Sequence, residues 1–375
     1  MAGIDKRRLR MGMIGGGPGS FIGPVHRIAA ELDREIELVA GAFSSDPNRS
    51  REAGETYRVD AARAYADVAA MLAGESGRSD GIDFVSIVSP NFHHLPAAQA
   101  ALASGIAVLC DKPVTATLAE AHLLKTAIDH AGLPFGITYT YSGYPMVREA
   151  RARIAAGAIG EIRKVVVEYP QGWLAGSAEG KQAEWRIDPA RAGEGGCIAD
   201  IGTHAFHLAE FVTGLRVTRL LADLAAVVPG RQLDDDVAIL LRFDNQARGV
   251  LLASQIETGE LNGLRIRVYG DKGGLVWRQD DQTNLALFRL DGSSEIIRAG
   301  TVVGDAAQQA SRTPGGHPEG YLEAFANIYR DFACQLRGTK GFAVPGIDEG
   351  LRGMAFVNTA VAASRDACGW VKLEI

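Results

Sequence analysis

Asp200 and His204 are the residues whose types and spacing most directly suggest proton transfer. They stand four residues apart in a helical pattern at 195–207 that follows a glycine turn. Side chains at that spacing, together with His207, share one face of an α-helix. An aspartate can orient a histidine, and a histidine pKa of about 6.5 suits a base at neutral pH. The alternative interpretation is an Asp–His pair that only holds its helix in place.

Lys112 is the second candidate for chemistry. It stands in Cys-Asp-Lys-Pro at 110–113, directly after a strand-like segment at 106–109. Pro113 biases Lys112 away from the α region, and ligands of α/β sheets bind outside the carboxyl ends of the strands. A lysine there would point at a substrate, although a single lysine is more often a solvated surface residue. The preceding strand ends in a polar turn at 88–94, at the same edge of the sheet.

A glycine-rich loop at 15–23 predicts a dinucleotide site. It reads Gly-Gly-Gly-Pro-Gly-Ser-Phe-Ile-Gly and lies between a strand-like segment and an apparent helix. Glycines at such a turn let the backbone approach a pyrophosphate, whose charge the helix N-terminus then meets. The third glycine of the usual pattern is displaced, so Gly23 takes its role only if the loop is longer than usual. The loop residues expected to bind the cofactor are Gly15, Gly17, Pro18, Gly19, Ser20, Phe21 and Ile22.

The end of the second expected strand bears on the choice between NAD and NADP. Phe or Ser stands where a ribose-binding acid is usual, and Asp46 before Pro47 is typical of a helix cap. Ser44 and Ser45 can hydrogen-bond a ribose, whereas Arg49 leaves NADP possible. We expect NAD.

The order of apolar segments predicts two domains. Strand-like runs at 9–14, 36–43, 84–88 and 106–109 alternate with helical stretches at 27–32, 47–55, 67–72, 96–104 and 118–131. That alternation is typical of a doubly wound α/β sheet. Later strand-like runs at 162–169, 237–243, 248–254, 264–269, 274–278 and 285–290 predict an open antiparallel or mixed sheet with one face available, followed by helices at 321–336 and 349–364. We therefore expect an α/β domain at 1–142 and an α+β domain at 143–375, with the helix at 349–364 packing back on the first.

Composition limits the class of partner. Lys plus Arg number 39 against 45 Asp plus Glu, so no basic excess suggests a nucleic-acid or anionic membrane surface. The four cysteines include no Cys-x-x-Cys pair, and no further ligand set accompanies Asp200 and His204, so we expect no disulfide framework and no metal. Glycines interrupt the apolar run after the basic N-terminus, and no run is long enough to span a membrane. A reduced, cytoplasmic protein with a small-molecule partner is expected.

Four motifs in register resemble the glucose–fructose oxidoreductase/inositol dehydrogenase family. They are the glycine loop, Ser-Pro-Asn-x-x-His at 89–94, Asp-Lys-Pro at 111–113 and Asp-Ile-Gly-Thr-His at 200–204. The resemblance implies a Rossmann domain, a second domain whose open sheet forms homodimers or homotetramers, and a site built from Lys112, Asp200 and His204. It implies further cofactor contacts from Ser89, Pro90, Asn91, His94, Asp111 and Lys112, although the family usually has Glu where Asp111 stands.

Softer subgroup resemblances at 144–148, 182–186 and 316–321 point to dehydrogenases of cyclic polyols and sugars, with scyllo-inositol and L-glucose as substrates. Such an enzyme would send a hydride to NAD and a proton to a base, for which we favour His204, with Lys112 stabilising the alkoxide. Lys112 itself is the base only if its pKa falls well below its usual value. Asp200 would fix Lys112, the imidazole or a second hydroxyl.

Polyol recognition needs many hydrogen-bonding groups and an aromatic surface. The residues expected to contact substrate beside Asp200 and His204 are Tyr141, Gln171, Trp173, Arg186 and His317. Tyr141 and Trp173 could instead pack between domains, and Arg186 could form an ion pair. The loop at 173–181, rich in small residues, is expected to border the pocket, so side-chain size at Ala178 would affect substrate fit.

Two other functions fit the same fold. One is an enzyme that uses the redox step inside another reaction, such as NAD-assisted glycoside cleavage. The other is a non-catalytic NAD-binding regulator, which the presence of the Lys, Asp and His set disfavours.

Overall fold

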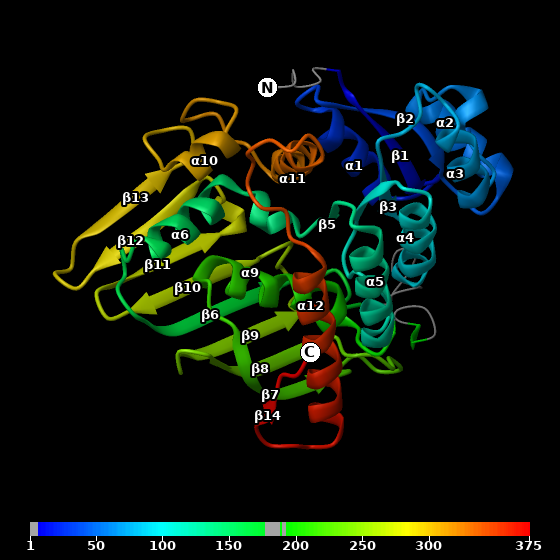
Figure 1. Ribbon diagram of the computed structural model, residues 1–375. Helices are drawn as coiled ribbons and strands as arrows, with labels where there is room; N and C mark the ends of the chain where they lie inside the picture. The colour runs from blue at the N-terminus through cyan, green and yellow to red at the C-terminus, as the bar shows by residue number, and fades with distance from the viewer. Residues whose placement is uncertain (1–6, 177–187, 190–192) are drawn as a thin grey trace. The chain divides into compact units, whose positions relative to one another are not determined.

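The computed structural model describes residues 7–176, 188–189 and 193–375, and the chain forms two compact units (Figure 1). The first contains the chain up to Thr140 together with Tyr321–Leu351, and the second contains Tyr141–Gly320 with Arg352–Ile375. Residues 321–351, expected from the sequence in the second domain, thus group with the first unit.

The first unit is built on a five-stranded parallel sheet in the order β2-β1-β3-β4-β5. Its strands are β1 (Leu9–Gly15), β2 (Ile36–Ala42), β3 (Phe84–Val88), β4 (Ala107–Cys110) and β5 (Phe135–Ile137). The four strands expected from the sequence are present. The sequence did not predict β5, because its three residues are too short for a periodicity signal.

The crossover helices are α1 (Ile22–Glu31), α2 (Pro47–Tyr57), α3 (Val68–Ser76), α4 (His94–Ala103) and α5 (Leu118–Ala131). Local sequence explains several ends. Asp46 caps α2 before Pro47, and Thr117 with Glu120 forms a capping box on α5, which ends at Gly132 in the left-handed region. Helix α1 begins at Ile22 rather than near Arg27, because Pro24 falls in the first turn, where proline is tolerated.

Helix α11 (Tyr321–Leu336) completes the core of the first unit. Phe325, Ile328, Tyr329 and Phe332 are buried in one cluster with strand residues such as Met11. Helix α11 also packs directly against α1. This apolar face explains why a segment so late in the sequence belongs to the first unit.

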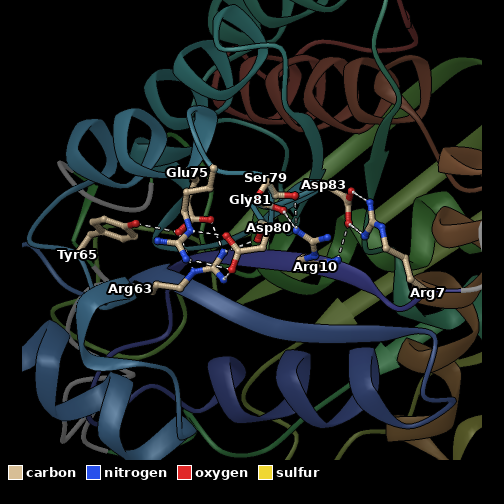
Figure 2. A network of polar contacts seen from close by, with 10 residues as sticks. Arg7, Arg10, Arg63, Tyr65, Glu75, Ser79, Asp80, Gly81 and Asp83 are labelled. Atoms are coloured by element: carbon tan, nitrogen blue, oxygen red, sulfur yellow. Dashed lines mark hydrogen bonds and ion pairs between the residues drawn. The ribbon is translucent and has the colours of Figure 1, made fainter.

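A polar network in the same unit connects the start of β1 and the segment before α3 with α3 itself and the residues that follow it (Figure 2). The buried guanidinium of Arg63 donates to both carboxylate oxygens of Glu75, and the Tyr65 hydroxyl donates to the same carboxylate at 2.8 Å. Arg7 donates two hydrogen bonds to the Asp83 carboxylate in a bidentate arrangement. The same carboxylate also accepts from the backbone amide of Arg10. These contacts tie the start of β1 to the segment that leads into β3.

The second unit contains a nine-stranded sheet in the order β13-β12-β11-β10-β6-β9-β8-β7-β14. Its strands are β6 (Ile162–Pro170), β7 (Val217–Ala225), β8 (Asp236–Phe243), β9 (Arg248–Ser254), β10 (Arg265–Gly270), β11 (Gly273–Arg278), β12 (Asn284–Arg289), β13 (Ser294–Arg298) and β14 (Val371–Lys372). Among the strands that the structure describes in this sheet, only β6 and β9 pair in parallel. The expected open, mostly antiparallel sheet is confirmed, with β7, β13 and β14 added to the strands expected from the sequence.

Within the described residues, helices lie on one face of this sheet and none is drawn on the other (Figure 1). The helices of the second unit include α6 (Pro145–Ala155), α9 (Thr203–Thr213), α10 (Asp305–Ala310) and the later part of α12 (Ile347–Arg365). Helix α9 is buried almost all round and contacts β6 and α6. The strand residues alternate between buried and exposed, as a sheet with one covered face requires. Over the described part of the chain, no helix is long and apolar enough to cross a membrane.

Gly23 holds the glycine loop against the start of α1. A Cβ built at Gly23 would lie 2.6 Å from the Cα of Gly16 and 2.7 Å from the Tyr57 hydroxyl. That hydroxyl donates a 2.6 Å hydrogen bond to the Gly16 carbonyl. Gly23 therefore fills the close-packing position of a longer loop.

We expect Gly23→Ala to lower the free energy of unfolding by about 1–3 kcal/mol, because the added methyl group overpacks a backbone contact. The matched control is Gly77→Ala at the end of α3, where an added Cβ meets nothing within 4 Å. Urea denaturation of both variants measures the difference. Equal losses in the two variants would contradict this packing role.

Candidate active site

The backbone of the glycine loop is shaped for close approach by a ligand. Gly15, Gly16 and Gly19 have φ values of +91°, +77° and +80°. A Cβ at Gly15 would lie 2.7 Å from the Ser89 amide nitrogen, and one at Gly17 would lie 2.6 Å from the Phe43 carbonyl. At Gly19 no atom lies within 4 Å of that position, so the backbone there is uncovered. This loop, just before α1, fits a pyrophosphate.

The rest of the loop leads into α1. Ser20 Oγ accepts from the Gly23 amide at 3.1 Å, and Phe21 is 65% exposed. The first turn of α1, which starts with Ile22, has no acidic side chain, so no carboxylate opposes an anion at this helix end.

The turn after β2 is organised by Asp46. Its carboxylate accepts from the amides of Asn48 at 2.8 Å and Arg49 at 3.3 Å, as expected of a helix cap. Ser44 Oγ accepts from the Asp46 amide, and Ser45 is exposed. The Arg49 guanidinium donates to the Pro18 carbonyl at 2.9 Å, so this side chain reaches back to the glycine loop. A carboxylate at the α2 N-terminus disfavours an added 2′-phosphate there.

His94 joins the two loops that follow β3 and β4. Its buried ring lies 2.9 Å from the Ser89 carbonyl and 2.8 Å from the Pro113 carbonyl. Pro90 is exposed. Asn91, which follows it, is buried at the start of the short helix that leads to His94. The expected cofactor residues of the turn at 88–94 and the loop that carries Lys112 therefore form one connected edge of the sheet.

Asp111 faces the interior of the first unit. Its Oδ1 accepts from Thr138 Oγ1 at 2.7 Å and from the Lys112 amide at 2.8 Å, and its Oδ2 lies 3.8 Å from His26 Nε2. Burial alone would raise the pKa of Asp111, but His26, Lys112 and Thr138 outweigh it and hold this pKa below its usual range. The carboxylate thus anchors the backbone of the half-exposed Lys112.

A chain of buried groups continues from His26. His26 Nδ1 lies 2.7 Å from the Tyr329 hydroxyl, which lies 2.7 Å from Ser86 Oγ. Through Tyr329, helix α11 therefore contacts His26, the residue that lies beside Asp111 in the interior of this unit.

In the second unit, Asp234 fixes the segment that carries Asp200. Its two carboxylate oxygens accept from the amides of Gly196 and Ile198, both at 2.7 Å, and its carbonyl accepts from the Cys197 amide at 2.8 Å. Burial raises the pKa of Asp234 to about 6, against the opposing effect of these amides.

The expected single α-helix is wrong for this segment. Residues Ile198–Gly202 form a π-helical turn, and α9 begins only at Thr203. Gly195 and Gly196 precede this turn, Gly202 ends it, and Asp234 accepts from the amides at its start. Such wider turns often occur at functional sites. Asp200 lies in the π turn, where Gln255 Nε2 donates to its Oδ2 at 2.9 Å.

Asp200, His204 and Tyr141 come together. The Tyr141 and His204 rings meet edge to face with centroids 4.9 Å apart, and the Tyr169 ring lies 6.2 Å from His204. Burial, assisted by the negative charge of Asp200, raises the pKa of Tyr141 to about 12. His204 is itself buried, at the start of α9.

Gln171 and Trp173 join this cluster through Asn262. Gln171 Nε2 donates to Asn262 Oδ1 at 2.7 Å, and Trp173 Nε1 donates to Gln171 Oε1 at 2.9 Å. The sequence did not single out Tyr169, Asn262 or Gln255. Tyr169 shares the strand alternation with the buried face of β6, which could have indicated it. Asn262 lies in a turn without a motif.

Of the other expected substrate residues, the structure describes His317, which does not join this cluster. His317 is exposed, with Nδ1 3.2 Å from the Pro314 carbonyl, and it lines a hollow of about 10 Å³ beside Gln282 and Thr313. Arg186 and Ala178 lie outside the described residues. Within the described part of the chain, no three His, Cys, Asp or Glu side chains are grouped to hold a metal ion.

His207 faces different neighbours from His204. Its ring stacks on Phe211 with centroids 5.6 Å apart. Burial, with the positive charges of Arg151 and Arg216, lowers the pKa of His207 to about 3. The imidazole is therefore neutral at neutral pH.

This depressed pKa has a consequence for stability. Between pH 6.5 and about 3 the unfolded chain binds a proton that folded His207 does not, so stability falls as the pH is lowered through this range. We expect His207→Gln to reduce the slope of unfolding free energy against pH by up to about 1.4 kcal/mol per pH unit. Urea denaturation at pH 4.5–7 of both proteins measures it, and identical slopes would contradict the assignment.

Comparison with known proteins agrees with this geometry. Residues 9–139 match the oxidoreductase family with an NAD-binding Rossmann fold, and residues 147–276 match the GFO/IDH/MocA C-terminal domain. The uncharacterized oxidoreductase YfiI of Bacillus subtilis is 33% identical over 99% of this chain and 98% of its own.

Two further relatives have named ligands or substrates. An inositol dehydrogenase homolog from Azotobacter vinelandii, solved with NADH and myo-inositol, superposes with a TM-score of 0.91 at 32% identity over 98% of both chains. Levoglucosan dehydrogenase of Pseudarthrobacter phenanthrenivorans is 27% identical over 74% of this chain and 76% of its own. This chain belongs to the Gfo/Idh/MocA family of oxidoreductases, with an NAD-binding Rossmann domain in its first unit.

Proposed function

We propose that this protein oxidises a secondary or anomeric hydroxyl of a cyclic polyol or sugar, with NAD as the acceptor. The candidate substrates are scyllo-inositol, which would become a keto-inositol, and L-glucose, which would become its lactone. The observation that carries the proposal is the grouping of Asp200 and His204 with Tyr141, beside the amide side chains of Gln171 and Gln255. The relative solved with myo-inositol supports this substrate class.

NAD, when bound, accepts the hydride from the substrate carbon. His204 removes the hydroxyl proton, because a neutral imidazole accepts one at neutral pH. We assign to Lys112 the positive charge that stabilises the developing alkoxide. Asp200 orients the base or binds a second hydroxyl of the substrate. It accepts a hydrogen bond from Gln255, and Asp234 fixes the π turn on which it lies.

The proposed location is the cytoplasm. Its support is chemical: Cys110, Cys197, Cys334 and Cys368 are all free thiols, as expected of a protein in a reducing compartment.

We also propose that the protein is a homodimer or homotetramer joined through the open sheet face. One register row of this face includes Leu240, Val250, Val166, Arg267, Val276, Ala286 and Ile296. Of these side chains only Arg267 is charged, and it is paired with Glu168. Leu240 is 43% exposed and Ile296 is 47% exposed, as is usual for side chains that a partner covers.

The substrate proposal is tested by screening NAD reduction with inositol isomers and both glucose enantiomers, and by repeating the screen with NADP. We expect NADH formation with scyllo-inositol or L-glucose and a preference for NAD over NADP. Cleavage of a glycoside without net NADH would favour the alternative chemistry, and no turnover of any polyol would overturn the proposal.

The base assignment predicts that His204→Ala lowers kcat by about 10²–10⁴-fold, the usual contribution of a general base. We expect Lys112→Ala to lower kcat as well but to retain the pH dependence of a histidine base. The control is His122→Ala on the exposed side of α5. Near-wild-type turnover of His204→Ala in pH–rate profiles would contradict the assignment of His204 as the base.

For the oligomer, sedimentation velocity is expected to give two or four times the 39.8 kDa chain mass. Leu240→Glu should shift the protein toward monomers, because it replaces an exposed apolar side chain of this row with a charge that a partner would have to bury. Leu123→Glu, at a position on α5 that is 56% exposed, is the control. A wild-type monomer at micromolar concentration would contradict the proposal.

A further inference from the structure

Three side chains in the second unit close a ring of hydrogen bonds. The Tyr169 hydroxyl donates to Asn262 Oδ1 at 2.6 Å, and Asn262 Nδ2 donates to the Tyr141 hydroxyl at 3.2 Å. The Tyr141 and Tyr169 hydroxyls are also in direct contact. The three residues come from a short helix at Thr140–Gly143, the end of β6 and the turn before β10.

Donor chemistry fixes the direction of this ring. A carbonyl oxygen cannot donate, so the single proton of Tyr169 is used on Asn262 Oδ1. The contact between the two hydroxyls must therefore be donated by Tyr141 to Tyr169. Each bond in such a ring polarises the next, which strengthens the whole.

The ring changes the role expected for Tyr141. Its proton is committed to Tyr169, and its pKa is raised to about 12, first by burial. The hydroxyl is thus not available to donate to a substrate. What Tyr141 presents is its aromatic ring, which meets His204 edge to face at 4.9 Å.

Asn262 is the branch point that holds this arrangement. Its Oδ1 accepts from both Tyr169 and Gln171, while its Nδ2 donates to Tyr141. A neutral amide suits this position, because its oxygen accepts twice while its nitrogen donates from the same short, planar group. A carboxylate at this position would accept but could not donate to Tyr141, and it would add a negative charge to a site that already holds Asp200.

We propose that Asn262 is a positioning residue for His204, acting through the paired tyrosines Tyr141 and Tyr169. The amide locks both rings, and the rings fix the orientation of the imidazole. Tyr141 serves as a wall of the site and not as a hydrogen-bond donor to the substrate. The proposal rests on the proposed function in assigning the proton transfer to His204.

The kinetic test compares Asn262→Asp, Tyr141→Phe and the double variant in the full-length protein, with the polyol that gives NADH. We expect each single variant to lower kcat by about tenfold or more, as misplacement of a catalytic group does. The KM for the polyol should stay within about twofold, because neither group is expected to bind it. The double variant should lose little more than either single variant, since both break the same ring.

A second readout does not depend on turnover. Nuclear magnetic resonance titration of the His204 ring, assigned with His204→Gln, should give a higher pKa in Asn262→Asp than in wild type, because the new carboxylate favours the imidazolium. Asn262→Leu, which removes the ring without adding charge, should not raise this pKa. Cofactor affinity, measured by NADH fluorescence, should be unchanged in all variants.

The matched control is Asn245→Asp, which alters a hydrogen-bonded asparagine in the turn between β8 and β9 of the same unit. It should leave both kcat and the His204 titration unchanged. A tenfold rise in polyol KM with unchanged kcat in Tyr141→Phe would overturn the proposal, because it would show that the hydroxyl binds substrate. An unaltered His204 titration in Asn262→Asp would overturn it as well. If no polyol reduces NAD, the proposed function fails, and the titration still decides the role of Asn262.

Discussion

Polar groups buried beside a functional segment must find partners inside the protein, and this constraint fixes the local geometry of both units. In the second unit the decisive partner is Asp234. Its carboxylate satisfies two amides at the start of the turn that carries Asp200, and the turn widens to a π-helix before α9 begins. Because these amides are satisfied by a side chain from a distant segment, Asp200 and His204 do not depend on an ordinary helix start.

The first unit meets the same constraint in another way. Asp111 is kept ionised in the interior by Thr138, by the Lys112 amide and by the nearby His26. His26 is in turn held by Tyr329 of α11, which explains why a late helix is needed to complete an early domain.

Local sequence signals predicted much of this structure. The glycine loop, the strand-to-helix alternation and the capping residue Asp46 act over a few positions, so their consequences can be predicted from neighbouring residues. The π turn could not be predicted in this way, because it depends on Asp234, far along the chain. The sequence did not identify Tyr169 and Asn262 as part of the site for the same reason. Tertiary contacts bring them together, and neither belongs to a sequence motif. The grouping of α11 with the first unit is likewise a result of packing.

The hydrogen-bond inventory also bears on how the proposed enzyme would tell one stereoisomer from another. Every hydroxyl of a cyclic polyol both donates and accepts, so a recognising group must supply the complementary role at each position. Gln171 and Gln255 carry amides that can do both. Gln171 donates to Asn262 and accepts from Trp173, and Gln255 donates to Asp200. The hydroxyl protons of Tyr141 and Tyr169 are used in hydrogen bonds within the ring, so neither hydroxyl donates to a substrate. Since a buried polar group left without its partner costs far more than a lost contact, a hydroxyl of the wrong configuration would be penalised at the glutamines. Selectivity and proton transfer would therefore depend on different side chains that share one scaffold, with Asn262 as the link between Gln171 and the rings that flank His204.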